Sequence, residues 1–157
     1  MFDDFDGFDD LQDLYQQVIL DHGRKPRNFR ALKEADSSAD GYNPLCGDQV
    51  TVFCKLADGK IGDISFQGKG CAICTASASL MTQSIKDKSL EEATAIFEAF
   101  HTLVAEDHPE NADAQTLGKL EVFSGVRKYP IRVKCATLPW HTLNAALNKK
   151  SEPVSTE

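Results

Sequence analysis

Alternating apolar and polar residues in two neighbouring segments predict a β-hairpin, and this pattern constrains the fold more than any other. In residues 50–56 an apolar stripe of Val50, Val52, Cys54 and Leu56 alternates with Thr51, Phe53 and Lys55, which is the period of a strand with one buried face. Asp58-Gly59 then predicts a tight turn, after which residues 61–66 return as the second strand. The chain should therefore contain a small antiparallel sheet.

Helical patterns surround this hairpin. Apolar residues at helical spacing predict a helix from about Leu11 to Asp21, and small residues predict a closely packed helix over about 71–86. A capping box, Ser89-Leu-Glu-Glu92, marks the start of a further helix. A shorter helix is expected over about 115–124, and Pro139 suits the first turn of a last helix.

The domain organisation follows from the absence of internal repeats and linkers. We expect one α+β domain over residues 11–148, in which the sheet packs against several helices. Residues 1–10 are rich in aspartate, and we interpret them as a disordered acidic leader. Residues 149–157 are polar, and we interpret them as a flexible tail.

Charge and hydropathy exclude several functions. The formal net charge is −7 over 157 residues, which argues against binding of nucleic-acid phosphates as the main task. No segment approaches the roughly 20 apolar residues of a membrane-spanning helix. The N-terminal residues also lack the basic and apolar regions of a signal peptide. We therefore expect a cytoplasmic protein that binds neither nucleic acid nor membrane.

The chain contains five cysteines. An odd number without an export signal predicts free thiols rather than a disulfide framework. Cys54 continues the apolar face of the first predicted strand, and we interpret it as a buried hydrophobic residue. The pair Cys71-x-x-Cys74 alone is ambiguous between a redox dithiol, half of a zinc ribbon, and one functional cysteine followed by a packed one. We favour a structural role for Cys74.

The remaining cysteines lie beside breaks in the predicted secondary structure. Cys46 and Asp48 share a loop that Pro44 and Gly47 should make rigid, Cys71 follows two glycines, and Cys135 precedes the predicted last helix. Three thiolates and a carboxylate give four ligands, the number that zinc prefers, and sulfur favours zinc or iron–sulfur chemistry. A carboxylate is the weaker partner for such a metal, which indicates an exchangeable, working site.

These residues, in this order, resemble the IscU/NifU N-terminal family of iron–sulfur cluster assembly proteins. The resemblance extends from about Leu14 to Leu147. It rests on Asn43-Pro44-x-Cys46-Gly47-Asp48, on Gly68-x-Gly70-Cys71-Ala-Ile-Cys74 and on Lys134-Cys135. It implies a single-domain IscU-like fold with a sheet of about three antiparallel strands packed against helices.

Within that family the sequence resembles the SufU branch. The scaffold branch has a histidine immediately before the last cysteine and a Pro-Pro-containing chaperone-recognition segment, whereas this chain has Lys134 and no such segment. The additional residues over about 106–124 and the segment 132–140 are similar to the SufU branch. The resemblance implies a SufS-type cysteine desulfurase as partner, with Arg132 in contact with it and Cys46 as persulfide acceptor. It also implies zinc held by Cys46, Asp48, Cys71 and Cys135.

Three functions remain open. The first is a zinc-dependent sulfur carrier that supplies downstream iron–sulfur assembly proteins, a sulfurtransferase-like partner of the desulfurase rather than a stand-alone enzyme. In this hypothesis a group of the desulfurase displaces Cys46 from the metal and frees it as a nucleophile. The second is a scaffold that assembles a [2Fe–2S] cluster, with iron on the same ligands. The third is a zinc-stabilised interaction module without sulfur chemistry.

Overall fold

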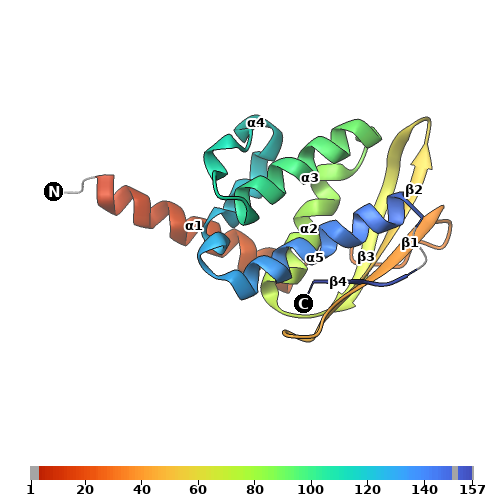
Figure 1. Cartoon of the computed structure of the whole chain (residues 1–157), viewed down its shortest axis with the longest axis horizontal. Coiled ribbons are helices and arrows are strands. Elements are labelled where there is room, and N and C mark those ends of the chain that lie inside the picture. The colour runs from red at the N-terminus through yellow and green to blue at the C-terminus, as the bar shows by residue number, and fades with distance from the viewer. Residues whose placement is uncertain (1–3, 150–151, 157) are drawn as a thin grey trace.

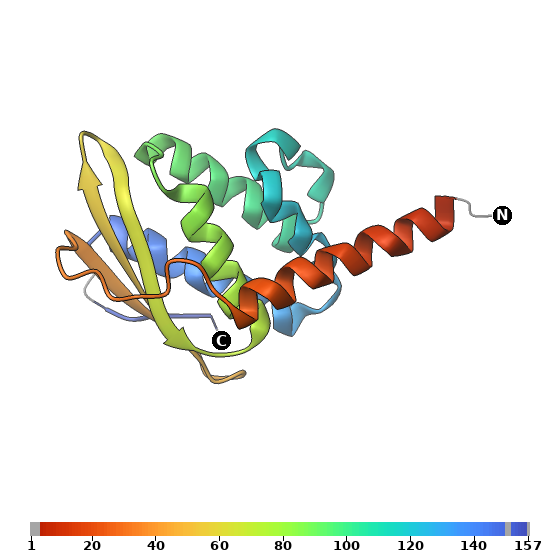
Figure 2. The ribbon, with the colours of Figure 1, turned by 180° about the vertical axis from the view of Figure 1, so that it is seen from behind.

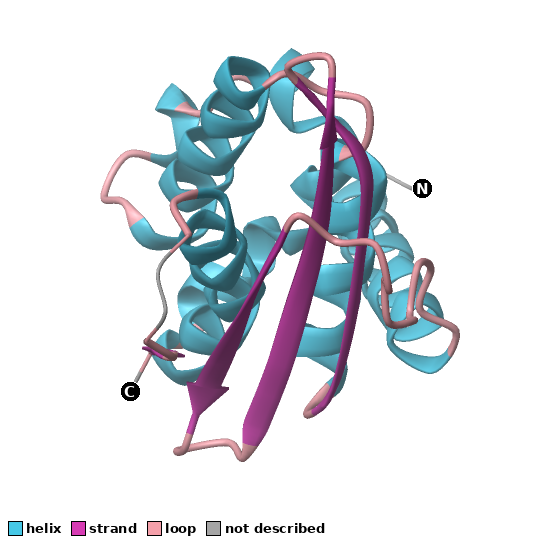
Figure 3. Ribbon diagram, turned by 90° about the vertical axis from the view of Figure 1, so that its right-hand side faces the viewer, coloured by secondary structure: helices cyan, strands magenta, loops and turns pink. Residues whose placement is uncertain are grey.

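The computed structural model describes residues 4–149 and 152–156, with side chains from Leu11 onward. A sheet lies on one side of the molecule and the helices on the other (Figures 1 and 3). The elements in chain order are α1 (Asp4–Arg24), β1 (Ser37–Asn43), β2 (Asp48–Ala57), β3 (Lys60–Lys69), α2 (Ala72–Ile85), α3 (Leu90–Ala105), η1 (Pro109–Asn111), α4 (Ala114–Leu117), η2 (Gly118–Lys128), α5 (Pro130–Leu147) and β4 (Val154–Ser155).

The sheet has the strand order β3-β2-β1-β4. The predicted hairpin is confirmed as β2 and β3, with Val52 opposite Phe66 and Cys54 opposite Ile64. β1 pairs antiparallel with β2, and β4 pairs parallel with β1. The α+β class is therefore confirmed, but the sheet is mixed and has four strands in the described residues, where the sequence predicted about three antiparallel strands.

Helices α2 and α5 pack on the same side of the sheet, α2 against β3 and α5 against β1 and β2. The strands turn every second residue toward them, so Val50, Val52 and Cys54 are buried. Behind this layer the rings of Phe100 and Trp140 stack with centroids 4.8 Å apart and hold α3 against α5. The core thus fixes the position of α5 relative to the first two strands.

The expected helices over 71–86 and from Ser89 are confirmed as α2 and α3. The capping box is present: the Glu92 backbone N–H donates to Ser89 Oγ, and the Ser89 N–H donates to the Glu92 carboxylate. The region expected as a helix over 115–124 is instead the short α4 followed by the 3₁₀ helix η2. Gly118, the first residue of η2, has a φ of +52° and ends α4 after one turn.

The last helix begins nine residues earlier than predicted. Pro130 takes the first helical position of α5, and Pro139 lies inside the helix. Pro139 has no N–H to donate to the carbonyl of Cys135, four residues upstream, yet packing on the sheet maintains the helix through this point. Cys135 therefore lies within α5, and the predicted break before the last helix was wrong.

The N-terminal helix also begins earlier than expected. α1 starts at Asp4 and not near Leu11, so most of the expected disordered leader is helical. The sequence explains this earlier start, because Phe5 and Phe8 precede Leu11 at three-residue intervals and continue the helical pattern upstream. Residues 1–3 of the expected leader lie outside the described residues. Figures 1 and 2 show α1 extending beyond the rest of the molecule toward the N-terminus.

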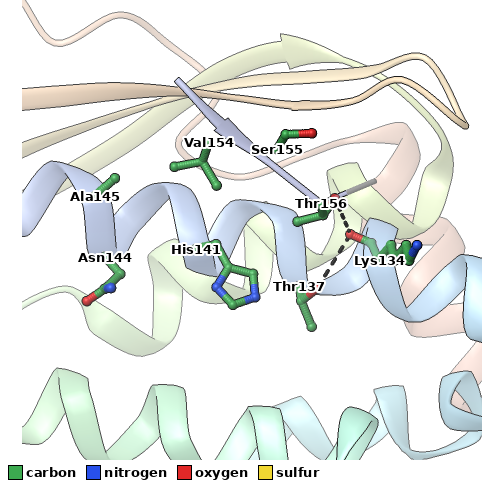
Figure 4. Close-up of a pocket in the computed structure, with 8 residues that line it drawn as sticks. All are labelled: Lys134, Thr137, His141, Asn144, Ala145, Val154, Ser155 and Thr156. Atoms are coloured by element: carbon green, nitrogen blue, oxygen red, sulfur yellow. Dashed lines mark hydrogen bonds between the residues drawn. The ribbon is translucent and has the colours of Figure 1, made fainter. Parts of the chain in front are cut away.

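The end of the chain, expected as a flexible tail, returns to the sheet. Val154 and Ser155 pair with Gly41 and Tyr42 of β1, whose outer edge would otherwise be open. The Thr156 hydroxyl donates to the carbonyl of Lys134 over 3.2 Å. This segment and α5 line a pocket of about 380 Å³ (Figure 4). Among the described residues, no helix is both long and apolar enough to cross a membrane.

Candidate metal centre

The Cys46 loop connects β1 to β2 at one end of the sheet. The Cys46 backbone N–H donates to the Asn43 carbonyl over 3.2 Å, and Gly47 has a φ of +73°, a conformation that favours glycine. Cys46 is partly exposed, and Leu45 beside it is exposed. The loop thus presents a thiol at the surface from a tightly turned backbone, as the sequence predicted.

Asp48 is the first residue of β2 and is almost completely buried, with 1% of its surface exposed. Its direction follows from the strand period, because the alternation that buries Val50 and Val52 turns Asp48 to the same face. The Cys71 backbone N–H donates to Asp48 Oδ1 over 2.8 Å. Gly70 makes this approach possible, since a Cβ at that position would collide with the Asp48 carboxylate.

Cys71 is the N-cap of α2. Its Sγ accepts a hydrogen bond from the Cys74 backbone N–H at 3.5 Å. The positive end of the helix dipole therefore lies next to this sulfur and favours negative charge on it. Cys71 is partly exposed, and its Sγ lies 4.0 Å from Asp48 Oδ2.

Cys135 reaches the same place from α5. It is completely buried, and its Sγ lies 3.3 Å from Cys46 Sγ. Burial raises the pKa of the Cys135 thiol, and hydrogen bonds to Cys46 and Asp48 raise it further. A bound metal cation would reverse this effect, because metal coordination favours the thiolate.

Four of the predicted site residues thus meet between β1, β2, α2 and α5. Ligand atoms of Cys46, Asp48 and Cys135 all lie within 4.8 Å of one another, and Cys71 Sγ borders the Asp48 carboxylate. Three sulfurs and one carboxylate are donors that suit zinc or an iron–sulfur centre. The chemistry of this donor set therefore fits a thiophilic metal.

The other two cysteines lie outside this group. Cys54 is completely buried in the sheet, and burial raises its pKa to about 12. Cys74 is buried in α2, and burial together with the negative charge of Asp48 raises its pKa. Both thiols are therefore held in the neutral, unreactive form, in agreement with their predicted packing roles.

Asn43 is a further member of the site that the sequence analysis did not assign. Its side chain is completely buried, and Nδ2 lies 3.5 Å from both Asp48 Oδ2 and Cys135 Sγ. Asn43 is the cross-strand partner of Asp48. The available signal was its place in the Asn-Pro-x-Cys-Gly-Asp motif, where the amide can orient two of the predicted ligands.

Arg132 is exposed on the first turn of α5, one turn before Cys135. A side-chain hydrogen bond to Cys135, followed by the charge of Cys71, raises the pKa of the Arg132 guanidinium. Arg132 also lines a pocket of about 360 Å³ together with Tyr15 of α1 and Tyr129. The arginine thus borders the cysteine cluster and faces solvent at the same time.

Comparison with known proteins gives the family of this chain. Residues 14–136 match the sequence profile of the NifU-like N terminal domain. The zinc-dependent sulfurtransferase SufU of Bacillus subtilis is 41% identical over 140 residues, which cover 89% of this chain and 93% of SufU. The iron–sulfur cluster assembly scaffold protein IscU of Streptococcus pyogenes is 38% identical, over 90% of this chain and 87% of IscU.

Solved structures agree with this assignment. The SUF-system protein FiSufU of Fervidobacterium islandicum aligns with a TM-score of 0.76 and 34% identity, covering 83% of this chain and 94% of FiSufU. The N-terminal part of a NifU-like protein from Brucella abortus aligns with a TM-score of 0.78 and 27% identity, over 88% and 95% of the two chains. The chain therefore belongs to the family of NifU-like N-terminal domains.

Proposed function

We propose that this protein is a cytoplasmic iron–sulfur cluster assembly protein that accepts sulfur on Cys46 from a SufS-type cysteine desulfurase. The observation that carries the proposal is the meeting of a partly exposed thiol, Cys46, with two buried ligand atoms, on Asp48 and Cys135. The similarity to a zinc-dependent sulfurtransferase supports a sulfur carrier.

Zinc would be held by Cys46, Asp48, Cys71 and Cys135. When bound, it would keep the three thiols as thiolates and offset their negative charge. Asp48 is oriented for this role by the Cys71 backbone N–H, which occupies Oδ1 and leaves Oδ2 on the side of the cysteines. Asn43 contacts the same oxygen and Cys135 Sγ, and so supports two ligands at once.

Sulfur transfer would proceed through the Cys46 thiolate. This thiolate attacks the outer sulfur of a persulfide on the desulfurase, and a new S–S bond forms to Cys46 Sγ. The S–S bond of the donor persulfide breaks, and the donor cysteine leaves as a thiolate. One sulfur atom moves with its oxidation state unchanged, so the step needs no external oxidant or reductant.

The surface around Cys46 suits a protein partner. Leu45, Tyr129 and Ile131 are exposed by 63%, 62% and 59%, and they lie in the Cys46 loop and at the start of α5. Exposed apolar side chains of this size are typical of interaction sites when they surround a functional group. Arg132 adds a positive charge, which would attract an anionic persulfide and acidic groups of the desulfurase.

Assembly of a [2Fe–2S] cluster on the same four residues is the alternative, and the similarity to the IscU scaffold favours it. Lys134 supports the carrier instead, because this position offers no imidazole next to Cys135. Anaerobic purification distinguishes the two. Stoichiometric zinc and a persulfide on Cys46 support the carrier, whereas a cluster chromophore that survives transfer to an acceptor protein supports the scaffold. Metal loss that unfolds the chain without affecting any desulfurase would indicate a zinc-stabilised interaction module.

The proposal is tested by replacing Cys46 and measuring the stimulation of a SufS-type desulfurase. Cys46→Ala should abolish the stimulation, while Cys54→Ala, which removes a buried thiol outside the cluster, should retain it. Circular dichroism establishes that both variants are folded. Desulfurase turnover that Cys46→Ala stimulates as strongly as the unaltered protein would refute the proposal.

Arg132 is tested in the same assay as a docking residue. Arg132→Gln should raise the concentration of this protein needed for half-maximal stimulation by about tenfold, since a charge-assisted contact contributes about 1.5 kcal/mol or more. Lys128→Gln removes a nearby exposed charge and serves as the control. Equal effects of the two substitutions would show that only the overall charge matters.

A further inference from the structure

We propose that Glu98, His101 and His141 form a second metal site, separate from the cysteine cluster, for a first-row divalent ion such as Zn²⁺ or Ni²⁺. Two imidazoles and a carboxylate are ligands of the type that these ions prefer. The site would lie on the surface between α3 and α5, where no sulfur is available to it.

The two imidazole rings already lie next to each other, in an edge-to-face arrangement, across the helix pair. The ring centroids of His101 on α3 and His141 on α5 are 6.1 Å apart, with an angle of 75° between the ring planes. Two imidazoles on one zinc ion have centroids about 5 to 6 Å apart, because each Zn–N bond is about 2 Å long. The backbones of α3 and α5 therefore already provide the spacing of a bridging ion.

The hydrogen bond of His101 fixes which of its nitrogens is free. His101 Nδ1 lies 3.1 Å from Glu106 Oε1, so Nδ1 donates to this carboxylate and Nε2 is the nitrogen left to face a ligand. Carboxylate–histidine pairs of this kind orient histidine ligands in metal sites. The bond to Glu106 thus prepares His101 to bind a cation through Nε2.

His141 is available for a ligand as well. Its described contacts are ring contacts with Phe97 and His101, and within the described part of the chain neither ring nitrogen has a hydrogen-bond partner. Burial, followed by the charge of His101, lowers the pKa of His141 and keeps it neutral. His141 also borders the pocket between α5 and β4 that Figure 4 shows.

The surroundings complete the site. A surface depression of about 390 Å³ is lined by both histidines together with Glu98, Glu106 and Phe97. Glu98 precedes His101 by three residues on α3, so the two side chains share one face of the helix. Glu98 is exposed, and its side chain must rotate to reach the ion, because the three ligands converge less tightly than Cys46, Asp48 and Cys135.

The second site is distinct from the cysteine cluster. His141 lies six residues after Cys135 on α5, which places it about 9 Å further along the helix axis and turned by about 120° around it. Each site uses a different set of residues, with cysteine sulfur in one and imidazole nitrogen in the other. Substitution of the residues of one site should therefore remove metal binding at that site and leave the other site intact.

The test is a calorimetric titration of untagged protein that already carries one equivalent of Zn²⁺. Further Zn²⁺ should bind as a second, weaker event, and His101→Ala or His141→Ala should weaken that event at least tenfold. His108→Ala is the matched control, because His108 is paired with Glu110 in the same way but has no second histidine beside it. This control should leave the second event unchanged.

Nuclear magnetic resonance of the imidazole nitrogens provides a second readout that does not depend on affinity. The second equivalent of Zn²⁺ should shift the signals of His101 and His141 and leave those of His22 and His108 in place. Thermal denaturation establishes that the alanine variants are folded. The proposal is overturned if the second binding event is absent, if it persists in both alanine variants, or if the shifted signals belong to other histidines.

Discussion

The backbone N–H of Cys71 donates a hydrogen bond to Oδ1 of Asp48 over 2.8 Å. This bond joins the start of α2 to the start of β2. It also gives the two oxygens of the carboxylate different contacts. Oδ1 is held by the backbone, while Oδ2 lies 4.0 Å from Cys71 Sγ and 3.5 Å from Asn43 Nδ2. Oδ1 is therefore held by the backbone, whereas Oδ2 lies among side chains of the site, where it could bind the proposed metal.

Asp48→Asn should weaken zinc binding less than Cys135→Ser does. The amide oxygen still accepts the hydrogen bond from Cys71, so the fold is retained, and the three sulfurs provide most of the affinity for a borderline-soft metal. We expect a loss of about tenfold for Asp48→Asn and of more than a hundredfold for Cys135→Ser. Competition with a chromophoric chelator measures both constants.

Asp40→Asn is the matched control for this comparison. Asp40 lies on β1, is exposed, and accepts a hydrogen bond from Thr51 away from the cysteines. The Asp40→Asn variant should bind zinc as tightly as the unaltered protein does. If Asp48→Asn and Cys135→Ser lost the same amount of zinc affinity, this would contradict the claim that the sulfur ligands contribute more to zinc binding than the carboxylate does.

Gly70→Ala should destabilise the protein even without metal. The added methyl group would collide with the Asp48 carboxylate, and overpacking of this kind costs about 1 to 3 kcal/mol. Urea denaturation in the presence of a chelator measures the effect free of any metal contribution. Gly62→Ala on β3 is the control, because its Cβ would come closest to Ala57 Cβ, at 3.1 Å, and would not approach Asp48. If Gly70→Ala lowered the free energy of unfolding less than Gly62→Ala does, Gly70 would not pack closely against Asp48.

Ser77→Ala should destabilise the contact between α2 and α5. Ser77 is completely buried, donates to the Ala136 carbonyl over 2.5 Å, and accepts from Trp140 Nε1 at 3.1 Å. Its loss removes both hydrogen bonds and leaves the buried Trp140 indole N–H without its acceptor, which costs about 1 to 3 kcal/mol. Urea denaturation followed by the fluorescence of Trp140 measures this directly, since the chain has one tryptophan.

Ser84→Ala on the same helix is the control for Ser77→Ala. Ser84 is partly exposed, and its substitution should change stability by less than about 0.5 kcal/mol. If the two alanine variants unfold at the same urea concentration, Ser77 does not join the two helices in the way the structure indicates.

Cys54 should make the stability of the protein depend on pH in the alkaline range. The folded chain raises the pKa of Cys54 from 9.0 to about 12, so the folded state keeps a proton that the unfolded state releases. The stabilisation is complete below pH 9 and is lost as the pH rises toward 12. Between these limits the loss is about 1.4 kcal/mol per pH unit.

Cys54→Val provides the reference for this effect, because valine has no proton to release. The difference in unfolding free energy between the unaltered protein and Cys54→Val should be constant from pH 7 to 8. It should then shift in favour of the variant between pH 9 and 11. A difference that stays constant across the whole range would mean that the Cys54 thiol is not buried as described.

The sequence predicted those parts of the fold that local patterns encode. The alternation in residues 50–56 predicted the hairpin, and the same period places Asp48 on the buried face with Val50. Ser89 and Glu92 predicted the start of α3 to within one residue, because a capping box is a contact between near neighbours. The loop with its Pro and Gly residues places Cys46 near Asp48, and these two ligand atoms converge with that of Cys135.

What the sequence did not reveal depends on contacts between distant segments. β1 has the sequence SSADGYN, which lacks an apolar stripe, since its inward residues Ala39, Gly41 and Asn43 are small or polar. His22 is buried with Nδ1 2.7 Å from Ser79 Oγ on α2, a contact between segments 57 residues apart that no local pattern encodes. Pro139 was interpreted as a helix start because local rules favour proline there, whereas packing against the sheet carries α5 through it.

The central claim is that Cys46 receives the sulfur. The most direct measurement is mass spectrometry of proteolytic peptides after the zinc-loaded protein has reacted with a SufS-type desulfurase and cysteine, with free thiols blocked before digestion. The account predicts one additional sulfur atom on the peptide that contains Cys46 and none on the peptides that contain Cys71 or Cys135. A persulfide found on either of those cysteines, with Cys46 unmodified, would contradict it.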